Sequence, residues 1–476
     1  MKAKNIFKLF LLGSILTFTS CDENDLDLEY ELGDVYDSST GNIQSENKLE
    51  YVTNGIYSIL GGAGFLGAQF LVYNDVVSDN VFVSNTNSGY YLNYQNINWV
   101  GDSDLGFLNT GYDVISQANV VINESSLPVT DRTKKLKGEA KLLRGYAYFV
   151  LAQLYSDLPT SGKNQEYGLP LNLGIYNPNT KFSRATVSET YNQIIKDLTE
   201  GIVEMDPDGR DKKKTYISPL AGKLILAKVY LTRGQAGDYD KAISLADEVL
   251  TLQPGIEANK LYDYFTSTDV ALSEGQPETL FEIEQTPNYN LNVNSSLGSF
   301  YSNTGPQRSL LARQWVFDLY DKNDIRVKLF NSAATPISDV PKGVWLRKWP
   351  RNTSQGNYTM NVKVLRATEA KYIKMEALAK KGESTAALAL LNEHAIERGA
   401  PAYSGDALTA ILLDKQKEFI GEGHRFMDLK RNSLGFKRET NCLACELTAD
   451  SKYWVIPIPL AEMNRNPNMT QHPNWK

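Results

Sequence analysis

The sequence predicts a mostly α-helical protein: a tetratricopeptide-like scaffold of helix pairs, interrupted by irregular loop and short-strand insertions. Three observations support this fold class. Apolar residues recur every three or four positions in several segments of roughly 15 residues. Short turns that contain Gly join successive segments. Two long insertions lack the helical period and are rich in Asn, Ser, Gly, Tyr and Trp. Because neither helix of a pair can bury its apolar stripe alone, we expect the pairs to stack on one another.

The chain begins with a predicted secretory signal peptide at residues 1–20. Three Lys precede an apolar run from Leu9 to Phe18, which is too short to span a bilayer with ease. No later stretch stays apolar for about 18 residues, so we expect no membrane-spanning helix in the rest of the chain.

Cys21 follows a small residue at the end of this apolar run, an arrangement that resembles a bacterial lipoprotein cleavage site. Such a Cys becomes the mature N-terminus and carries several acyl chains, which together anchor a protein stably. We therefore predict lipidation of Cys21 and an acidic, lipidated tether at residues 21–40. The alternative is a plain signal peptide with an incidental Cys.

The helical scaffold is predicted mainly at residues 41–72, 104–252 and 366–431. Within the second of these ranges, apolar and aromatic residues recur at helical spacing from Lys141 to Pro159. Proline cannot continue a helix, so we expect this helix to end there.

The next pair of helices has clear start and stop signals. Ser218 is a predicted N-cap, Pro219 suits the first helical position, and Gly234 closes the helix. A second helix follows at once. The same design returns at residues 367–399, and a third pair begins near Leu408.

The ligand-binding insertions are predicted mainly at residues 73–103 and 255–365. The second insertion includes a strand-like piece at 279–286. The C-terminal segment 432–476 has no helical period. Its residues 454–459 are predicted to be an extended edge segment, because two Pro cannot serve a central strand.

Composition excludes several classes of function. The formal net charge is −7 with a pI of about 5.3, and loss of residues 1–20 removes three Lys and no acids, giving −10. Nucleic acid is therefore not expected as a partner, since phosphate binding needs clustered Lys and Arg. Three Cys and three His leave little room for a metal cage, so we expect no metal and no other cofactor.

Six segments, in this order along the chain, resemble the SusD/RagB family of outer-membrane nutrient-binding lipoproteins of Bacteroidetes. The segments are GEAKLLRGYAYFVLAQLYSDLP (138–159), KNDIR (322–326), VLRATEAKYIKMEALAKKG (364–382), LLNEHAIERGA (390–400), FIGEGHRFMDLKR (419–431) and WVIPIPLAEMNRNPNMTQHPNW (454–475). No single motif is decisive, but the ordered set is specific and extends over nearly the whole mature chain.

The resemblance implies that residues 41–476 form one SusD-like domain. It implies a lipid-anchored protein on the cell surface, at the outer membrane. Such a protein binds an oligosaccharide or polysaccharide and delivers it to a partner SusC-like TonB-dependent transporter, with no catalysis. The alternatives are a peptide-capturing lid of the same architecture, a helical-repeat adaptor that binds only protein, and a secreted glycoside hydrolase.

Aromatic and amide-rich stretches of the insertions are the predicted ligand site. Flat aromatic rings cover the apolar faces of sugars, while amides, carboxylates and guanidinium groups bind the hydroxyls. By resemblance, Trp99 ranks first, since its segment contributes stacking residues in the family. The alternative for each aromatic residue is a place in the core or at an interface. The candidates are Trp99, Tyr94, Asn98, Tyr73, Asn74, Asp75, Tyr90, Tyr91, Asn288, Tyr289, Trp315, Trp345, Arg347 and Trp349, with Tyr301 and Arg351 as further members.

Two pairs of carboxylates suggest the hydrolase alternative. Glu282 and Glu284 lie two positions apart in the predicted strand, so they would share a face about 7 Å apart. That distance overlaps the carboxyl spacing of inverting glycosidases. The other pair is Asp75 and Asp79.

Two further motifs are predicted to have structural rather than catalytic roles. We expect Arg425 to pair with Glu418, Glu422 or Asp428 as a buried lock, although His424 beside these acids also suggests acid–base chemistry. We expect Cys442 and Cys445 to form a disulfide in an oxidising compartment; a redox motif and free thiols are the alternatives.

Overall fold

The computed structural model describes residues 43–476, except 206, 208, 211, 335–341 and 353–355. The predicted signal peptide, Cys21 and the whole of the predicted acidic tether lie outside the described residues. Within the described ranges, no helix combines the length and the apolar character that crossing a membrane requires.

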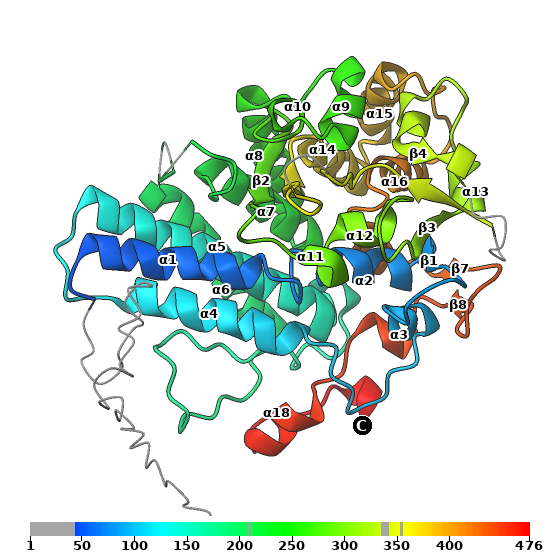
Figure 1. Cartoon of the computed structure of the whole chain (residues 1–476). Helices are drawn as coiled ribbons and strands as arrows, with labels where there is room; N and C mark the ends of the chain where they lie inside the picture. Colours follow the sequence, from blue (N-terminus) through cyan, green and yellow to red (C-terminus); the bar gives the residue numbers. More distant parts are fainter. Residues whose placement is uncertain (1–42, 206, 208, 211, 335–341, 353–355) are drawn as a thin grey trace, which may run out of the picture.

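A continuous series of packed helices forms the scaffold, and it confirms the predicted mostly helical fold. Each helix packs on the next: α1 on α4, then α5, α6, α7, α8, α14, α15 and α16 in turn. Figure 1 shows α1, α4, α5 and α6 side by side at one end of the molecule. Their bounds are α1 Glu46–Leu60, α4 Phe107–Asn123, α5 Asp131–Tyr155, α6 Val187–Met205, α7 Pro219–Arg233, α8 Asp238–Leu252, α14 Thr368–Lys380, α15 Ser384–Glu397 and α16 Ala407–Glu418.

The capping residues identified in the sequence start and stop α7. The Ser218 hydroxyl accepts a hydrogen bond from the amide of Ala221 at 3.2 Å, and Gly234 ends the helix with a φ of 59°. The long helix α5 differs from expectation at its end. It stops at Tyr155, before Pro159, because Ser156 already has extended backbone (φ −132°, ψ 157°).

Shorter elements make up the insertions and the C-terminal segment. Helix α2 continues beyond residue 72, so the start of the first insertion is helical. The short helices are α2 Gln69–Val77, α3 Leu92–Asn96, α9 Leu261–Thr266, α10 Val270–Ser273, α11 Asn292–Ser295, α12 Leu297–Tyr301, α13 Gln314–Phe317, α17 Arg425–Arg431 and α18 Leu460–Arg465.

Antiparallel strand pairs join the two insertions. The main sheet has the order β1-β3-β5-β4, and its pairing of Phe82 with Leu311 brings the first insertion against the second. The predicted strand near residue 280 is confirmed as β2, which pairs with β6. The strands are β1 Val81–Val83, β2 Thr279–Ile283, β3 Leu310–Arg313, β4 Phe330–Asn331, β5 Gly343–Leu346, β6 Val362–Arg366, β7 Phe436–Lys437 and β8 Glu446–Leu447.

The C-terminal segment returns to the scaffold. The amide of Ile456 donates to the carbonyl of Leu154 at 2.8 Å, so the Pro-containing stretch lies against the end of α5. Val455 has extended backbone, with φ −123° and ψ 133°. Trp475, next to the last residue, is buried, and its indole donates to the carbonyl of Val455 at 2.9 Å. The tail is therefore part of the folded body.

Candidate functional site: a tyrosine platform on the insertions

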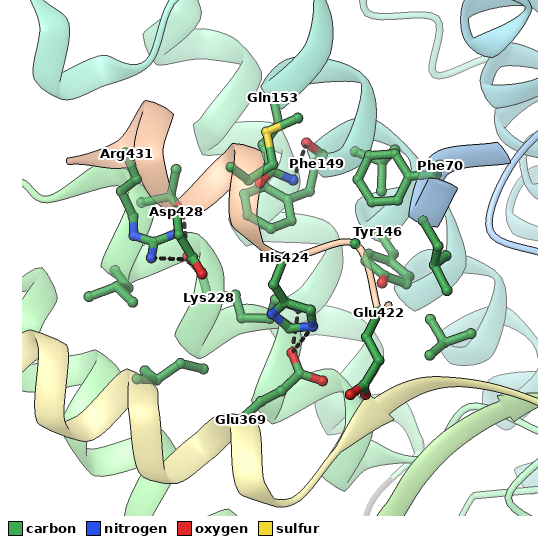
Figure 2. A pocket seen from close by; sticks show the side chains of 18 of the residues that line it. Phe70, Tyr146, Phe149, Gln153, Lys228, Glu369, Glu422, His424, Asp428 and Arg431 are labelled. Atoms are coloured by element: carbon green, nitrogen blue, oxygen red, sulfur yellow. Dashed lines mark hydrogen bonds and ion pairs between the residues drawn. The ribbon is translucent and has the colours of Figure 1, made fainter. Parts of the chain in front are cut away.

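The segment around His424 lines a small internal cavity of about 70 Å³. Ligand pockets usually measure about 300–1,000 Å³, so this cavity does not hold a substrate. Figure 2 shows the His424 ring pointing toward Glu369, with Asp428 and Arg431 paired beside it. Burial, followed by the charges of Lys228 and Lys415, lowers the pKa of His424 well below its usual value. An imidazole that is mostly buried and held in its neutral form does not support the prediction of acid–base chemistry.

Ion pairs around this cavity tie the scaffold to the insertions. Arg366 donates to Glu422 at 2.6 Å and to Glu278 at 2.7 Å, and all three side chains are buried. The predicted partners of Arg425 are wrong. Its guanidinium instead binds Asp79, with both oxygens contacted at 2.9 and 3.0 Å. Asp79 is far away in sequence, at the end of α2, and only the tertiary fold brings it near.

The predicted ligand residues of α2 belong to the core, which corrects their assignment. Tyr73 is fully buried, and its ring contacts those of Tyr94, Phe107 and Phe426 at centroid distances of 5.2, 5.3 and 5.6 Å. Asn74 and Asp75 are also fully buried. A ring enclosed by other rings cannot offer a face to a sugar.

The first-ranked candidate, Trp99, is likewise a core residue. It is 4% exposed and packs between Tyr73 and Tyr453. Tyr94, Trp345 and Trp349 are buried too, and the Trp349 indole donates to the carbonyl of Gly421 at 2.8 Å. Tyr301, a further candidate, is buried against Asp75. The structure therefore overturns the stacking role predicted for these rings.

Burial separates both carboxylate pairs from the open arrangement that the hydrolase alternative requires. Glu282 is 2% exposed and accepts a hydrogen bond from the amide of Gly275 at 3.0 Å, whereas Glu284 follows the last residue of β2 and is exposed. The prediction of a shared strand face is wrong, because only one of the two carboxylates reaches solvent. Asp75 and Asp79 are both buried.

Two of the predicted residues, Tyr90 and Tyr91, form an accessible aromatic surface, here named the tyrosine platform. Tyr90 is 38% exposed. Both rings rest on Phe300 of α12, with centroids 5.3 and 5.0 Å away, and lie 6.3 Å from each other. Phe300 is fully buried. The platform is therefore the exposed ring of Tyr90 beside the half-buried ring of Tyr91, both on an apolar base. Phe300 joins the first insertion to the second.

The backbone at the platform is strained. Tyr91 has a φ of 63°, a left-handed conformation that bulky residues rarely adopt. Strain of this kind costs about 1–3 kcal/mol and is commonest where a side chain is positioned for function. The ring of Tyr91 also stacks on Tyr94 at 5.8 Å, so core contacts hold it in place.

Polar side chains from both insertions form a hydrogen-bonded chain that starts at Ser88, two positions before Tyr90. The Ser88 hydroxyl donates to the side-chain carbonyl of Gln307 at 2.6 Å, and the Gln307 amide donates to Asn294 at 3.0 Å. Arg308, next in sequence, is exposed. Sequence reasoning missed Phe300, Gln307 and Asn294. The only signal was the Asn- and Ser-rich composition of the insertion.

The remaining candidates lie at other places on the surface. Tyr289 is 49% exposed and contacts Ser58 of α1. Arg347 donates to the Tyr262 hydroxyl at 3.1 Å, and Trp315 is half-buried. Asn98 and Asn288 are exposed. Arg351 donates to the carbonyl of Thr304. The predicted single site is thus divided into a buried group and several surface groups.

The sulfur atoms of Cys442 and Cys445 form the predicted disulfide, between the short strands β7 and β8. Among the described residues, no cluster of three or more His, Cys, Asp and Glu side chains is arranged to hold a metal ion.

Two family models match the chain, one in each half. The model described as "Starch-binding associating with outer membrane" matches residues 29–231, and that of the SusD family matches residues 289–475. No curated protein is detectably similar in sequence.

Solved structures share the whole fold. A SusD superfamily protein from Bacteroides thetaiotaomicron is 25% identical, with a TM-score of 0.78, over 90% of this chain and 100% of the other. One from Bacteroides vulgatus is 24% identical, with a TM-score of 0.80, over 91% and 99%. Surface glycan-binding protein A from Bacteroides fluxus is 19% identical, with a TM-score of 0.71, over 90% and 99%. The helical scaffold, its two insertions and the two family models agree: the chain belongs to the SusD family.

Proposed function

We propose that this protein binds an oligosaccharide or polysaccharide on the tyrosine platform and does not alter it. The observation that carries the proposal is the exposed ring of Tyr90 with the half-buried ring of Tyr91, both held on Phe300 and close in sequence to the hydrogen-bonded Ser88. Ring faces cover the apolar side of a sugar, and the neighbouring amides and hydroxyls exchange hydrogen bonds with its edge. The sugar- and glycan-binding descriptions of SusD-family structures support this choice of ligand.

We further propose that the protein is lipid-anchored through Cys21 at the outer membrane, on the cell surface. It delivers its glycan to a SusC-like TonB-dependent transporter. Support comes from the lipoprotein-like sequence around Cys21 and from the family model described as associating with the outer membrane. Replacing Cys21 by Ala should release the protein from the membrane fraction. Unchanged fractionation of this variant would contradict the lipid anchor.

The platform is tested by affinity gel electrophoresis with starch, xylan, mannan and mixed-linkage β-glucan in the gel. At least one polysaccharide should retard the protein. Tyr90→Ala should weaken that retention by about tenfold, since a lost stacking contact is worth about 1–2 kcal/mol. Tyr176→Ala is the matched control, because Tyr176 is a 66% exposed surface tyrosine on another loop.

Three outcomes contradict the proposal. If the gel retains the Tyr90→Ala and Tyr176→Ala variants equally, the platform does not bind the polysaccharide. New reducing ends in a time course with the retained polysaccharide show catalysis. Retention by a peptide column with no retention by any of the four polysaccharides indicates the peptide-capturing alternative.

A further inference from the structure

A second surface pocket lies where the scaffold meets the second insertion. Its volume is about 280 Å³, close to the lower limit of small-molecule sites. Helix α1, the loop before α7, strand β2 and the turn after β2 all contribute to it. The lining residues are Asn54, Tyr57, Ser58, Thr215, Tyr216, Phe281, Ile283, Glu284 and Tyr289. The platform and this tyrosine pocket share no residue.

A tight turn places Tyr289 over the end of α1. The amide of Thr286 donates to the carbonyl of Tyr289 at 2.7 Å, and the reverse bond measures 3.2 Å. The Tyr289 hydroxyl donates to the carbonyl of Ser58 at 3.0 Å. Half of the side chain is nevertheless exposed. The ring is thus positioned but remains available to a ligand.

Two more tyrosines form the wall of the pocket. Tyr57 and Tyr216 meet edge to face at 5.5 Å. The Tyr57 hydroxyl donates to the buried carboxylate of Glu139 and accepts from the amide of Ile217, so the ring is immobile. The Arg210 guanidinium lies 4.0 Å from the centroid of Tyr216. These contacts fix both rings before any ligand arrives, which lowers the entropic cost of binding.

The polar groups of the pocket include a donor and an acceptor with no partner among the described residues. The Asn54 amide oxygen accepts a hydrogen bond from Arg210 at 2.7 Å, which orients the amide and leaves its N–H groups unused. The Glu284 carboxylate is exposed, and no described side chain pairs with it. A sugar hydroxyl is both a donor and an acceptor, so these two groups are complementary to a diol.

The charge of the residues that line the pocket limits which sugars can bind there. Glu284 is the one acidic or basic side chain among the residues that line the pocket. Arg210, which lies over the Tyr216 ring, is already engaged by Glu50 at 3.0 Å and Glu139 at 2.9 Å. A uronate or sulfated residue would therefore meet an uncompensated carboxylate.

We propose that the tyrosine pocket binds one neutral pyranose residue of the same glycan chain, as a second subsite that excludes acidic sugars. The proposal rests on glycan binding at the platform. Tyr289 and Asn294, which borders the platform, are five positions apart in the sequence, so their Cα atoms lie within about 18 Å. Asn294 is linked through Gln307 to Ser88, two positions before Tyr90, so a glycan chain that extends from the platform along this segment leads toward the pocket.

The test uses saturation-transfer NMR of the purified protein with methyl glucoside, galactoside, mannoside and xyloside, and with methyl glucuronide. At least one neutral glycoside should give a signal that Tyr289→Ala lowers severalfold and Tyr51→Ala leaves unchanged, whereas Tyr90→Ala should lower only the part of the signal that comes from the platform. The glucuronide should bind about fivefold more weakly than the glucoside, and Glu284→Gln should remove most of that difference. Tyr51→Ala is a control, since Tyr51 is a 60% exposed tyrosine on α1 outside the pocket lining.

The outcomes separate this inference from the proposed function. If Tyr90→Ala weakens polysaccharide retention while Tyr289→Ala changes neither retention nor any glycoside signal, the platform stands and the pocket is overturned. If the glycoside signals from the pocket behave as expected but Tyr90→Ala leaves polysaccharide retention unchanged, the proposed role of the platform is overturned. Equal binding of glucuronide and glucoside overturns the exclusion of acidic sugars. Absence of every glycoside signal from the unmodified protein overturns the pocket.

Discussion

Arg366 contacts three carboxylates from different parts of the chain, and all of these side chains are buried. It binds Glu422 and Glu278 closely, and Glu418 lies 3.4 Å away. Buried ions are costly unless their partners are in place, so such a cluster makes each member dependent on the others. At the scale of single residues, this cluster holds the second insertion and the Glu422 segment against the scaffold.

Replacing Arg366 by Met should destabilise the protein by about 3–5 kcal/mol, because buried carboxylates lose their counter-charge. Urea unfolding followed by circular dichroism measures the change. Arg132→Met is the control, since Arg132 is 43% exposed and its pair with Glu50 should contribute about 0–1 kcal/mol. Equal losses in the two variants would contradict the role given to burial.

Asp75 is a second residue whose environment has a measurable consequence. Burial raises its pKa from 3.8 to about 7, although Tyr301 and the amide of Gly423 hydrogen-bond to it. The folded state therefore keeps a proton that the unfolded chain has already released. Its contribution to stability is greatest below about pH 4 and is lost as the pH rises toward 7.

The Asp75→Asn variant should not show this loss. Between pH 4 and pH 8 the free energy of unfolding of the unmodified protein should fall relative to the variant by up to about 4 kcal/mol. Paired denaturation curves across this range measure the difference. If the free energies of unfolding of the two proteins differ by the same amount at every pH, Asp75 is ionised in the folded state.

At the scale of elements, the stack depends on how closely the helices approach. Helices α5 and α6 cross at Gly138 and Gly201, where a Cβ on Gly201 would lie 2.6 Å from the carbonyl oxygen of Gly138. Backbone atoms cannot move aside as a flexible side chain does. These two glycines therefore set the spacing of the helix pair.

Gly201→Ala should cost about 1–3 kcal/mol, because the added methyl group forces the helices apart. Gly55→Ala in α1 is the matched control. A Cβ there meets only the end of the flexible Gln117 side chain, at 3.1 Å. Thermal unfolding should show a clear drop in Tm for the first variant and a small change for the second. A similar Tm in both would mean that the α5–α6 crossing adjusts freely.

At the scale of the whole molecule, buried acid–base pairs connect the helices of the scaffold with one another and with the second insertion. Arg431 of α17 pairs with Glu376 of α14 at 2.7 Å, and Arg326 pairs with Asp414 of α16 at 2.8 Å. Although burial opposes ionisation, these cations lower the pKa of Glu376 from 4.5 to about 2 and that of Asp414 from 3.8 to about 2.

Acid should therefore unfold the protein as a unit. The stability from Glu376 and Asp414 is fully present above about pH 4.5 and is lost as the pH falls toward 2. Tm measured from pH 6 to pH 2.5 should drop steeply below about pH 4. Salt at 1 M should change the profile little, since buried pairs are weakly screened. A flat profile would contradict this account.

The sequence was sufficient to predict the helical scaffold. Apolar periodicity, the Ser218 cap and Gly234 are local signals, and the structure confirms them. The Cys442–Cys445 disulfide is equally local, with its partners three positions apart. The ordered family motifs lie along one chain and can be read without knowing its path in space.

Only the tertiary structure decided which rings face solvent. Trp99 and Tyr90 lie in the same insertion, yet one is 4% and the other 38% exposed. Burial depends on elements distant in sequence: Tyr453 covers Trp99, whereas Phe300 supports Tyr90 from below. Arg425 likewise binds Asp79 across the fold. Sequence alone thus determined the repeating helices and the family, because these depend on short-range order. The proposed binding surface depends on contacts between distant segments, and therefore only the folded chain shows which rings are accessible.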